Sequence, residues 1–169
     1  IETALLSGGP ADNRISASAF TLGSVTLEGA AGNDSLTGGS RDDSILAGDG
    51  DDVANGRGGD DLIPGGNGND VFSGGAGADT LEGDAGDDTL DGQGGRDQIH
   101  GGSGNDSLNG AGSPDTVIGG NGDDRIAGGS SGDVLNGSSG NDVIDGGSGS
   151  DRIFGGSGTD TLEGGSGEA

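Results

Sequence analysis

Several residue types are missing from this 169-residue chain. It has no Cys, which excludes disulfide bonds and thiol chemistry. It has no Lys, and six Arg against 30 acidic residues give a net charge of −24. Such a chain has no basic surface to neutralise phosphates, so nucleic acid is excluded as a natural partner and an anionic membrane surface is disfavoured. No run of about 18 apolar residues occurs, so membrane insertion is not expected.

Proline is also scarce, with three Pro against 45 Gly. Collagen combines Gly at every third position with abundant Pro or hydroxyproline, so this composition excludes it. A flexible linker needs no apolar residues in a fixed phase, whereas this chain keeps one, which favours a glycine-rich solenoid. Low hydrophobicity with high net charge is typical of disorder. We therefore expect the chain to stay unfolded until something cancels its charge.

A nine-residue period runs from Gly29 to Glu163, as fifteen consecutive nonapeptides without insertion or deletion. GGNGNDVFS (65–73) and GGSGNDSLN (101–109) are typical. Position 1 is Gly in fourteen repeats, with Ala47 the exception; position 4 is Gly in twelve, position 5 varies widely, and position 8 is always apolar. Position 6 is Asp in every repeat: Asp34, Asp43, Asp52, Asp61, Asp70, Asp79, Asp88, Asp97, Asp106, Asp115, Asp124, Asp133, Asp142, Asp151 and Asp160.

Each nonapeptide combines a glycine-rich turn with a short extended segment at positions 7 to 9. Alternation along a strand directs position 8 inward and positions 7 and 9 outward. One apolar residue per repeat cannot form a core alone, but stacked coils of two repeats can. The sequence therefore predicts an all-β parallel solenoid with two nonapeptides in each coil, two short-stranded parallel sheets and no helix. Fifteen repeats give seven and a half coils, about 36 Å in length at the usual strand spacing.

In such a stack, loops of odd-numbered repeats line one edge and loops of even-numbered repeats line the other. Each Asp then lies one coil from the next, where like charges repel unless a cation lies between them. Carboxylate and carbonyl oxygens suit Ca²⁺, whereas Mg²⁺ demands stricter geometry and zinc lacks its usual Cys and His ligands. Seven gaps on one edge and six on the other predict about 13 Ca²⁺ ions, which nearly neutralise the chain.

The pattern GGxGxDxUx, where U is apolar, resembles the RTX (repeats-in-toxin, hemolysin-type) calcium-binding nonapeptide family over residues 29–163. The resemblance implies a right-handed parallel β-roll from a protein secreted by Gram-negative bacteria, with Ca²⁺ between the loops of repeats n and n+2. It also implies the ligands. One loop offers the carbonyls of positions 2 and 4, the next offers those of positions 1 and 3, and both offer their position-6 carboxylates.

Carried onto this chain, the resemblance places a central ion between Asp70 and Asp88. The backbone carbonyls expected as ligands include those of Gly65, Gly66, Asn67, Gly68, Gly74, Gly75, Ala76, Gly77, Gly83, Ala85, Gly101, Gly102, Ser103, Gly104, Gly119, Gly120, Asn121, Gly122, Gly146, Gly147, Ser148 and Gly149. Position 4 departs from Gly at Arg41, Ser113 and Ser131. If position 4 needs a glycine-type φ, each departure costs about 0.5–1 kcal/mol. The gap between Asp115 and Asp133, flanked by both serines, is therefore predicted to be the weakest site or empty.

The N-terminal segment, 1–28, departs from the period. GGPADNRIS (8–16) is a degenerate repeat with Asn13 in place of Asp, three residues out of phase. We expect residues 1–28 to form one or two irregular strands that cap the roll, and the pattern does not indicate a calcium site there. The chain starts at Ile1 and stops within a sixteenth repeat (164–169), so we expect it to belong to a longer parent chain.

Catalysis is not indicated, because no HExxH or GxSxG motif occurs and the sole His, His100, falls at an outward position. Outward Thr residues are scattered rather than ranked as an ice-binding surface requires, and the acidic surface repels polyanionic sugars. Outward Leu46, Leu62, Ile118 and Phe154 all fall on the sheet of the even repeats, which leaves open a lateral contact between copies of the chain or with a neighbouring domain.

The sequence thus predicts a calcium-binding structural module, and not an enzyme. It would belong to a secreted, extracellular or cell-surface protein. Cytosolic calcium is too low to fill weak sites, whereas extracellular modules bind Ca²⁺ at about 10⁻⁴–10⁻³ M. The chain would pass a secretion channel unfolded, as in type I secretion, and fold outside. The alternative is a calcium-dependent stalk or self-assembling lattice segment of an adhesin or surface-layer protein.

Overall fold

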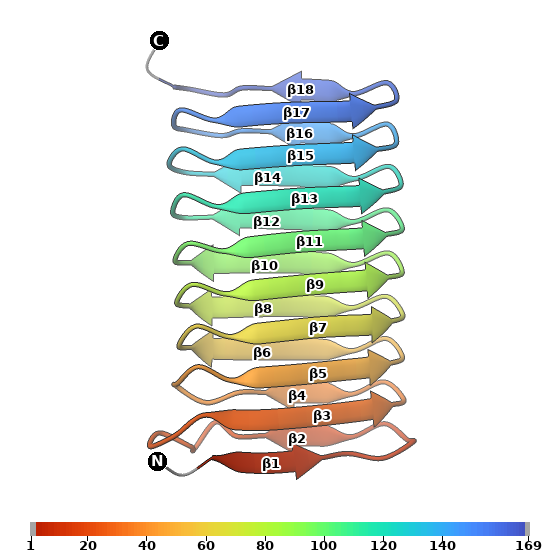
Figure 1. Ribbon diagram of the computed structural model, residues 1–169, viewed down its shortest axis with the longest axis vertical. Coiled ribbons are helices and arrows are strands. Elements are labelled where there is room, and N and C mark those ends of the chain that lie inside the picture. Colours follow the sequence, from red (N-terminus) through yellow and green to blue (C-terminus); the bar gives the residue numbers. More distant parts are fainter. Residues whose placement is uncertain (1–2, 168–169) are drawn as a thin grey trace.

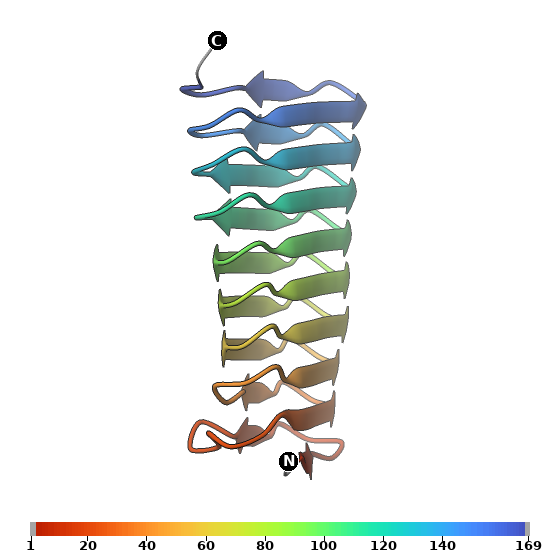
Figure 2. The ribbon, with the colours of Figure 1, turned by 60° about the vertical axis from the view of Figure 1, so that its left-hand side comes forward.

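A computed structural model describes residues 3–167 as a solenoid of parallel β-strands without helices in that range (Figure 1). The chain crosses the front of Figure 1 from left to right, returns behind it and rises with each turn, so the solenoid is right-handed. Each of its two sheets has nine strands, which corresponds to about nine coils. Figure 2 shows the coils stacked along one axis with the two sheets facing each other. The predicted fold class is confirmed.

The strands alternate between the two sheets along the chain. The front sheet contains, in spatial order, β1 (Ala4–Ser7), β3 (Val25–Ala31), β5 (Ser44–Asp49), β7 (Leu62–Asn67), β9 (Thr80–Ala85), β11 (Gln98–Ser103), β13 (Thr116–Asn121), β15 (Val134–Ser139) and β17 (Arg152–Ser157). The rear sheet contains β2 (Arg14–Ser16), β4 (Ser35–Thr37), β6 (Val53–Gly58), β8 (Val71–Ala76), β10 (Thr89–Gly94), β12 (Ser107–Ala111), β14 (Arg125–Gly129), β16 (Val143–Asp145) and β18 (Thr161–Glu163).

Most strands are longer than the predicted three residues. In β8 the strand starts at position 7 of one repeat and continues through position 3 of the next. The reason is that strand pairing extends into the glycine-rich turn, where Gln93 of β10 pairs with Gly75 of β8 and Gly94 with Ala76. Throughout the repeats, each strand residue pairs with the residue two nonapeptides later, so equivalent positions of all coils lie in straight columns.

Position 8 forms the core, as predicted. Its side chains from Leu36 to Ile144 are at most 2 % exposed and lie between the two sheets. Ala54, the one small residue of the series, pairs in register with Leu36 on one side and Phe72 on the other, which are the predicted neighbours. The core opens at the C-terminal coil, where Leu162 is 49 % exposed.

The N-terminal residues join the same two sheets with a longer offset. Ala4 pairs with Val25 and Arg14 with Ser35, partners that lie three positions further along the chain than two nonapeptides would place them. The three additional residues fall between β2 and β3, where the chain leaves the regular path before Val25. The predictions of an N-terminal cap (1–28) and of a sixteenth repeat that stops early (164–169) also cover residues 1, 2, 168 and 169, which lie outside the described residues. Within the described part of the chain, no helix is long and apolar enough to cross a membrane.

Candidate metal-binding loops

Two residues with left-handed backbone shape the loops. Position 2 has a positive φ in fourteen of the fifteen repeats, and position 4 has one in all repeats but two, those of Arg41 and Ser113. Glycine at position 2 takes values such as 110° at Gly66, whereas Asp84 takes 68°. A φ of 68° lies in the left-handed region that an L-residue tolerates best. The loop therefore keeps its path when a side chain occupies position 2.

Backbone carbonyls point from each loop toward its neighbours. The Gly48 and Gly50 carbonyl oxygens are the nearest atoms to any side chain that would be built on Gly66 and Gly68, one coil later. The Gly83 carbonyl oxygen faces back, 2.6 Å from a Cβ built on Gly65. Carbonyls of positions 2 and 4 thus point toward the following loop and those of position 1 toward the preceding one. Some of these carbonyls already accept one hydrogen bond: the position-3 carbonyl of Ala85 accepts the Gly68 N–H at 2.8 Å, and the position-2 carbonyl of Gly129 accepts the Ser148 N–H at 2.8 Å.

The position-6 aspartates lie inside the loops. Those from Asp34 to Asp142 are at most 4 % exposed, and Asp151 and Asp160 are half-buried. The register of two repeats per coil brings them together in two rows, one along each edge of the solenoid. We call these the odd edge, at the right of Figure 1, and the even edge, at the left, after the repeats whose loops form them.

The two oxygens of each carboxylate have different surroundings. Oδ1 accepts the backbone N–H of the position-6 residue one coil earlier, as Asp88 Oδ1 does from Asp70 N–H at 2.8 Å. Oδ2 faces the position-1 glycine of its own loop; a Cβ built on Gly128 would lie 2.7 Å from Asp133 Oδ2. This second oxygen is buried and has no hydrogen-bond partner in Asp34, Asp52, Asp61, Asp70, Asp79, Asp88, Asp97, Asp106, Asp115, Asp124, Asp133, Asp142 and Asp151.

Burial raises the pKa of the eleven position-6 carboxyls from Asp52 to Asp142, because it disfavours the charged form. The pKa of Asp61 and Asp70 is raised to about 7, against an ordinary value of 3.8. A backbone hydrogen bond from the preceding coil lowers each pKa in part, and the charges of neighbouring carboxylates raise it further. Burial also raises the pKa to about 6 in Asp79, Asp88, Asp115 and Asp124.

Because these pKa values are raised, the rolled chain holds protons more tightly than the unfolded chain. In chelator, protonation therefore favours the roll, an effect that is complete below about pH 4 and lost as the pH rises through about 7. We expect the chelator-treated chain to gain β-type circular dichroism between pH 8 and pH 5. In Ca²⁺, where protons compete with the ion, we expect acid to raise the calcium concentration needed for folding. An unchanged spectrum in chelator over this range would contradict the predicted proton linkage.

The donor set fits Ca²⁺. The described residues contain no cluster of three or more His, Cys, Asp or Glu side chains that could hold a metal ion. A cation between two loops must therefore combine carboxylates with main-chain carbonyls, and the carbonyls of positions 1, 2 and 4 point the right way. The unpartnered Oδ2 atoms are the polar atoms that such an ion would satisfy. All-oxygen donors from flexible loops are what Ca²⁺ prefers.

Position 5 holds a pattern that the sequence analysis missed. On the odd edge it alternates between the two Asx residues until Thr159 in the last odd repeat, in the order Asp12, Asn33, Asp51, Asn69, Asp87, Asn105, Asp123 and Asn141. Each side-chain Oδ1 accepts the position-5 N–H of the next coil, at 2.7–3.2 Å. Neutral amides separate the carboxylates, and Asn141 also donates its Nδ2 to Asp123 at 3.1 Å. Comparing odd repeats separately from even ones would have revealed this alternation, although not the hydrogen bonds that it makes.

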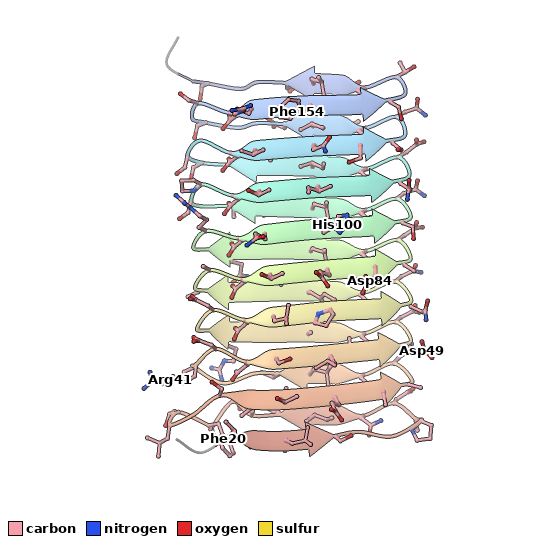
Figure 3. All side chains as sticks on the ribbon, viewed as in Figure 1. Phe20, Arg41, Asp49, Asp84, His100 and Phe154 are labelled. Atoms are coloured by element: carbon pink, nitrogen blue, oxygen red, sulfur yellow. The ribbon has the colours of Figure 1, made fainter. Side chains whose placement is uncertain are left out.

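His100 is exposed on the outer face of the front sheet, as predicted (Figure 3). The apolar residues Leu46, Leu62 and Phe154 are 41–49 % exposed and Ile118 is half-buried. All four lie on the front sheet: Leu46 and Leu62 are on the neighbouring strands β5 and β7, and Ile118 and Phe154 are on β13 and β17, which flank β15 with its exposed Val134.

Comparison with known families agrees with the geometry. Four copies of the model for the RTX calcium-binding nonapeptide repeat match residues 26–63, 64–99, 100–135 and 136–168. Among curated proteins no match was found. The matched segments contain all fifteen position-6 aspartates and nearly the whole of the two sheets. The chain belongs to the RTX calcium-binding nonapeptide repeat family.

Proposed function

We propose that the chain is a structural module that folds when Ca²⁺ binds its loops, after export from the cell. The observation that supports this most is the set of thirteen buried Asp Oδ2 atoms without a hydrogen-bond partner. A buried unpaired carboxylate is costly, and a cation between two of them removes the cost. Because the paired loops form only in the rolled chain, the free energy of ion binding contributes directly to folding.

The proposed ligands of a central ion are the carboxylates of Asp70 and Asp88 with carbonyls of Gly66, Gly68 and Gly83. These carbonyls occupy the repeat positions whose oxygens point into the gap between loops. The Ala85 carbonyl, expected as a further ligand, already accepts the Gly68 N–H across the same gap, and its second lone pair is left for the ion. If every gap between neighbouring aspartates fills, the chain takes about 13 ions.

Secretion and membership of a longer parent protein remain part of the proposal. The net charge of −24 with no Lys supports an unfolded state at low calcium, since self-repulsion opposes a compact chain. Extracellular calcium would then act as the folding signal. A stalk or lattice role is the alternative proposal. A rise in scattering mass on adding Ca²⁺ would favour that alternative.

The number of bound ions tests the ligand assignment. Asp88 faces one gap on each side, so Asp88→Asn is expected to lose about two ions at saturation and to unfold at lower temperature. The matched control is Asp87→Asn, the same chemical change at position 5 of the same loop, which should keep the full number of ions. Equilibrium dialysis with elemental analysis measures the count. Equal counts in the two variants would refute the assignment of position 6.

The gap between Asp115 and Asp133 remains our prediction for the weakest site. Asp115 N–H donates to Asp133 Oδ1 at 2.9 Å, as in regular gaps. Ser131 keeps the left-handed conformation with a φ of 95°, whereas Ser113 does not. The carbonyl of position 4 in the lower loop of this gap therefore lacks the backbone conformation found in regular loops.

A further inference from the structure

The lowest loop of each edge differs from all loops above it. These two loops are residues 8–13 on the odd edge and, directly above the irregular segment between β2 and β3, residues 38–43 on the even edge; each is the lowest loop of its edge that follows the repeat pattern. Neither has a left-handed residue at position 2 or position 4, which are Gly9 and Ala11 in the first and Gly39 and Arg41 in the second. Each higher loop has a left-handed residue at position 2. Position-2 and position-4 carbonyls are proposed calcium ligands, so this departure affects the donor set itself.

On the odd edge, Asn13 takes the place of a position-6 aspartate. Its N–H donates to Asp34 Oδ1 at 2.6 Å, and its carbonyl accepts Ser35 N–H at 2.9 Å, as in the repeats. Its side chain differs, because the Nδ2 group donates to the Gly9 carbonyl at 3.3 Å. Gly9 is at position 2. A neutral amide thus supplies to this carbonyl the positive partner that a cation would supply in other loops.

On the even edge, Asp43 has both oxygens bonded by the protein. Val25, which replaces Asp in the coil below, donates its N–H to Asp43 Oδ1 at 2.8 Å. The Gly39 N–H donates to Asp43 Oδ2 at 2.6 Å. Asp43 is 4 % exposed, so its surroundings are as buried as those of the other aspartates. It is nevertheless absent from the set of carboxylates with an unpartnered oxygen.

The segment between β2 and β3 covers this second loop. The Phe20 carbonyl oxygen would lie 2.8 Å from a Cβ on Gly39. Two arginines hold the segment: Arg57 Nη1 donates to the Ser18 carbonyl at 3.2 Å and Arg41 Nε to the Thr21 carbonyl at 3.5 Å. Figure 3 labels Arg41 and Phe20 on the same side of the lowest coils. Two of the chain's six arginines therefore bind the segment that covers this loop.

We infer that the lowest loop at each edge is closed by protein donors in place of Ca²⁺, so that Asp43 is not a calcium ligand. This inference rests on the proposed function and refines it. The calcium rows then begin at the gap between Asp34 and Asp52 on the odd edge and at the gap between Asp61 and Asp79 on the even edge. In the rolled chain the N-terminal coil is closed by amide and backbone donors, and it takes no Ca²⁺ ion of its own.

The test compares two aspartates of the even edge that share the same substitution. Asp43→Asn is expected to bind as many Ca²⁺ ions at saturation as the unaltered chain and to unfold at lower temperature. Asp79→Asn, in the interior of the same row, is expected to bind about two fewer. Ions are counted by equilibrium dialysis with elemental analysis, after circular dichroism in saturating Ca²⁺ has shown that each variant folds.

The outcomes separate the inference from the proposed function. Loss of ions in both variants would overturn the inference and leave the proposed function intact. Full counts in both would refute position 6 as the ligand, and the inference with it. Asn13→Ala supplies a second test that does not depend on the folding of Asp43→Asn. It removes the amide donor to Gly9 and should leave the ion count unchanged, whereas the loss of one ion would show that the lowest odd loop binds calcium.

Discussion

In chelator at or above neutral pH, the far-UV circular dichroism spectrum of this chain is expected to be that of a disordered polypeptide, and Ca²⁺ is expected to convert it cooperatively to a β spectrum. The midpoint should fall at about 10⁻⁴–10⁻³ M, the range of extracellular calcium modules. The reason is the balance between a thin core and a large charge. One buried aliphatic side chain per nonapeptide contributes about 1.5–3 kcal/mol, which the entropy cost of ordering that nonapeptide exceeds several-fold.

Cooperativity follows from the stacking of the loops. Each interior aspartate faces two gaps, so an ion bound in one gap fixes the position of a carboxylate that is also a ligand in the adjacent gap. Mg²⁺ at the same concentration serves as the control and should leave the spectrum disordered, because it dehydrates reluctantly and needs strict octahedral geometry. A stable β spectrum in chelator near neutral pH would show that the core is stable without ions. The prediction that Ca²⁺ triggers folding would then be wrong, even though the solenoid fold is right.

Gly86→Ala is expected to lower the free energy of unfolding in saturating Ca²⁺ by about 2–5 kcal/mol, since it combines left-handed strain with overpacking. Gly86 is at position 4 with a φ of 136°, and an added Cβ would lie 2.5 Å from the Gly68 carbonyl carbon. That carbonyl is a proposed calcium ligand, so the substitution disturbs both the stacking and the site. Thermal unfolding with ion counting measures both effects.

Ala85→Ser is the control for this substitution. It adds one heavy atom to the neighbouring residue, where the structure requires no left-handed backbone, and it should change the free energy of unfolding by less than about 0.5 kcal/mol. If Gly86→Ala changed the free energy of unfolding as little as Ala85→Ser does, the close contact between the loops of Gly68 and Gly86 would be refuted. Ser131 shows that position 4 can carry a side chain at a φ of 95°. It lies at the gap that we predict to bind calcium weakly.

Part of the N-terminal architecture could be inferred before the structure. The phase difference of GGPADNRIS (8–16) corresponds to the longer offset by which Arg14 pairs with Ser35. The offset places Asn13 where an aspartate would lie. The sequence could not reveal that the amide of Asn13 reaches Gly9, because that contact depends on a backbone path without left-handed residues. For the same reason, Asp43 looked equivalent to the other fourteen aspartates.

The sequence by itself determined the solenoid, its coil of two repeats, the inward position 8 and the two rows of aspartates. These features follow from periodicity, because a fixed period forces equivalent residues into columns whatever their detailed contacts. The tertiary structure alone decided how each carboxylate divides its oxygens between a backbone N–H and an unpartnered buried position. It also decided the Asx ladder of position 5 and the closure of the lowest loops. Those features depend on which groups of neighbouring coils come within hydrogen-bonding distance, and a nine-residue sequence pattern does not specify the distances between coils.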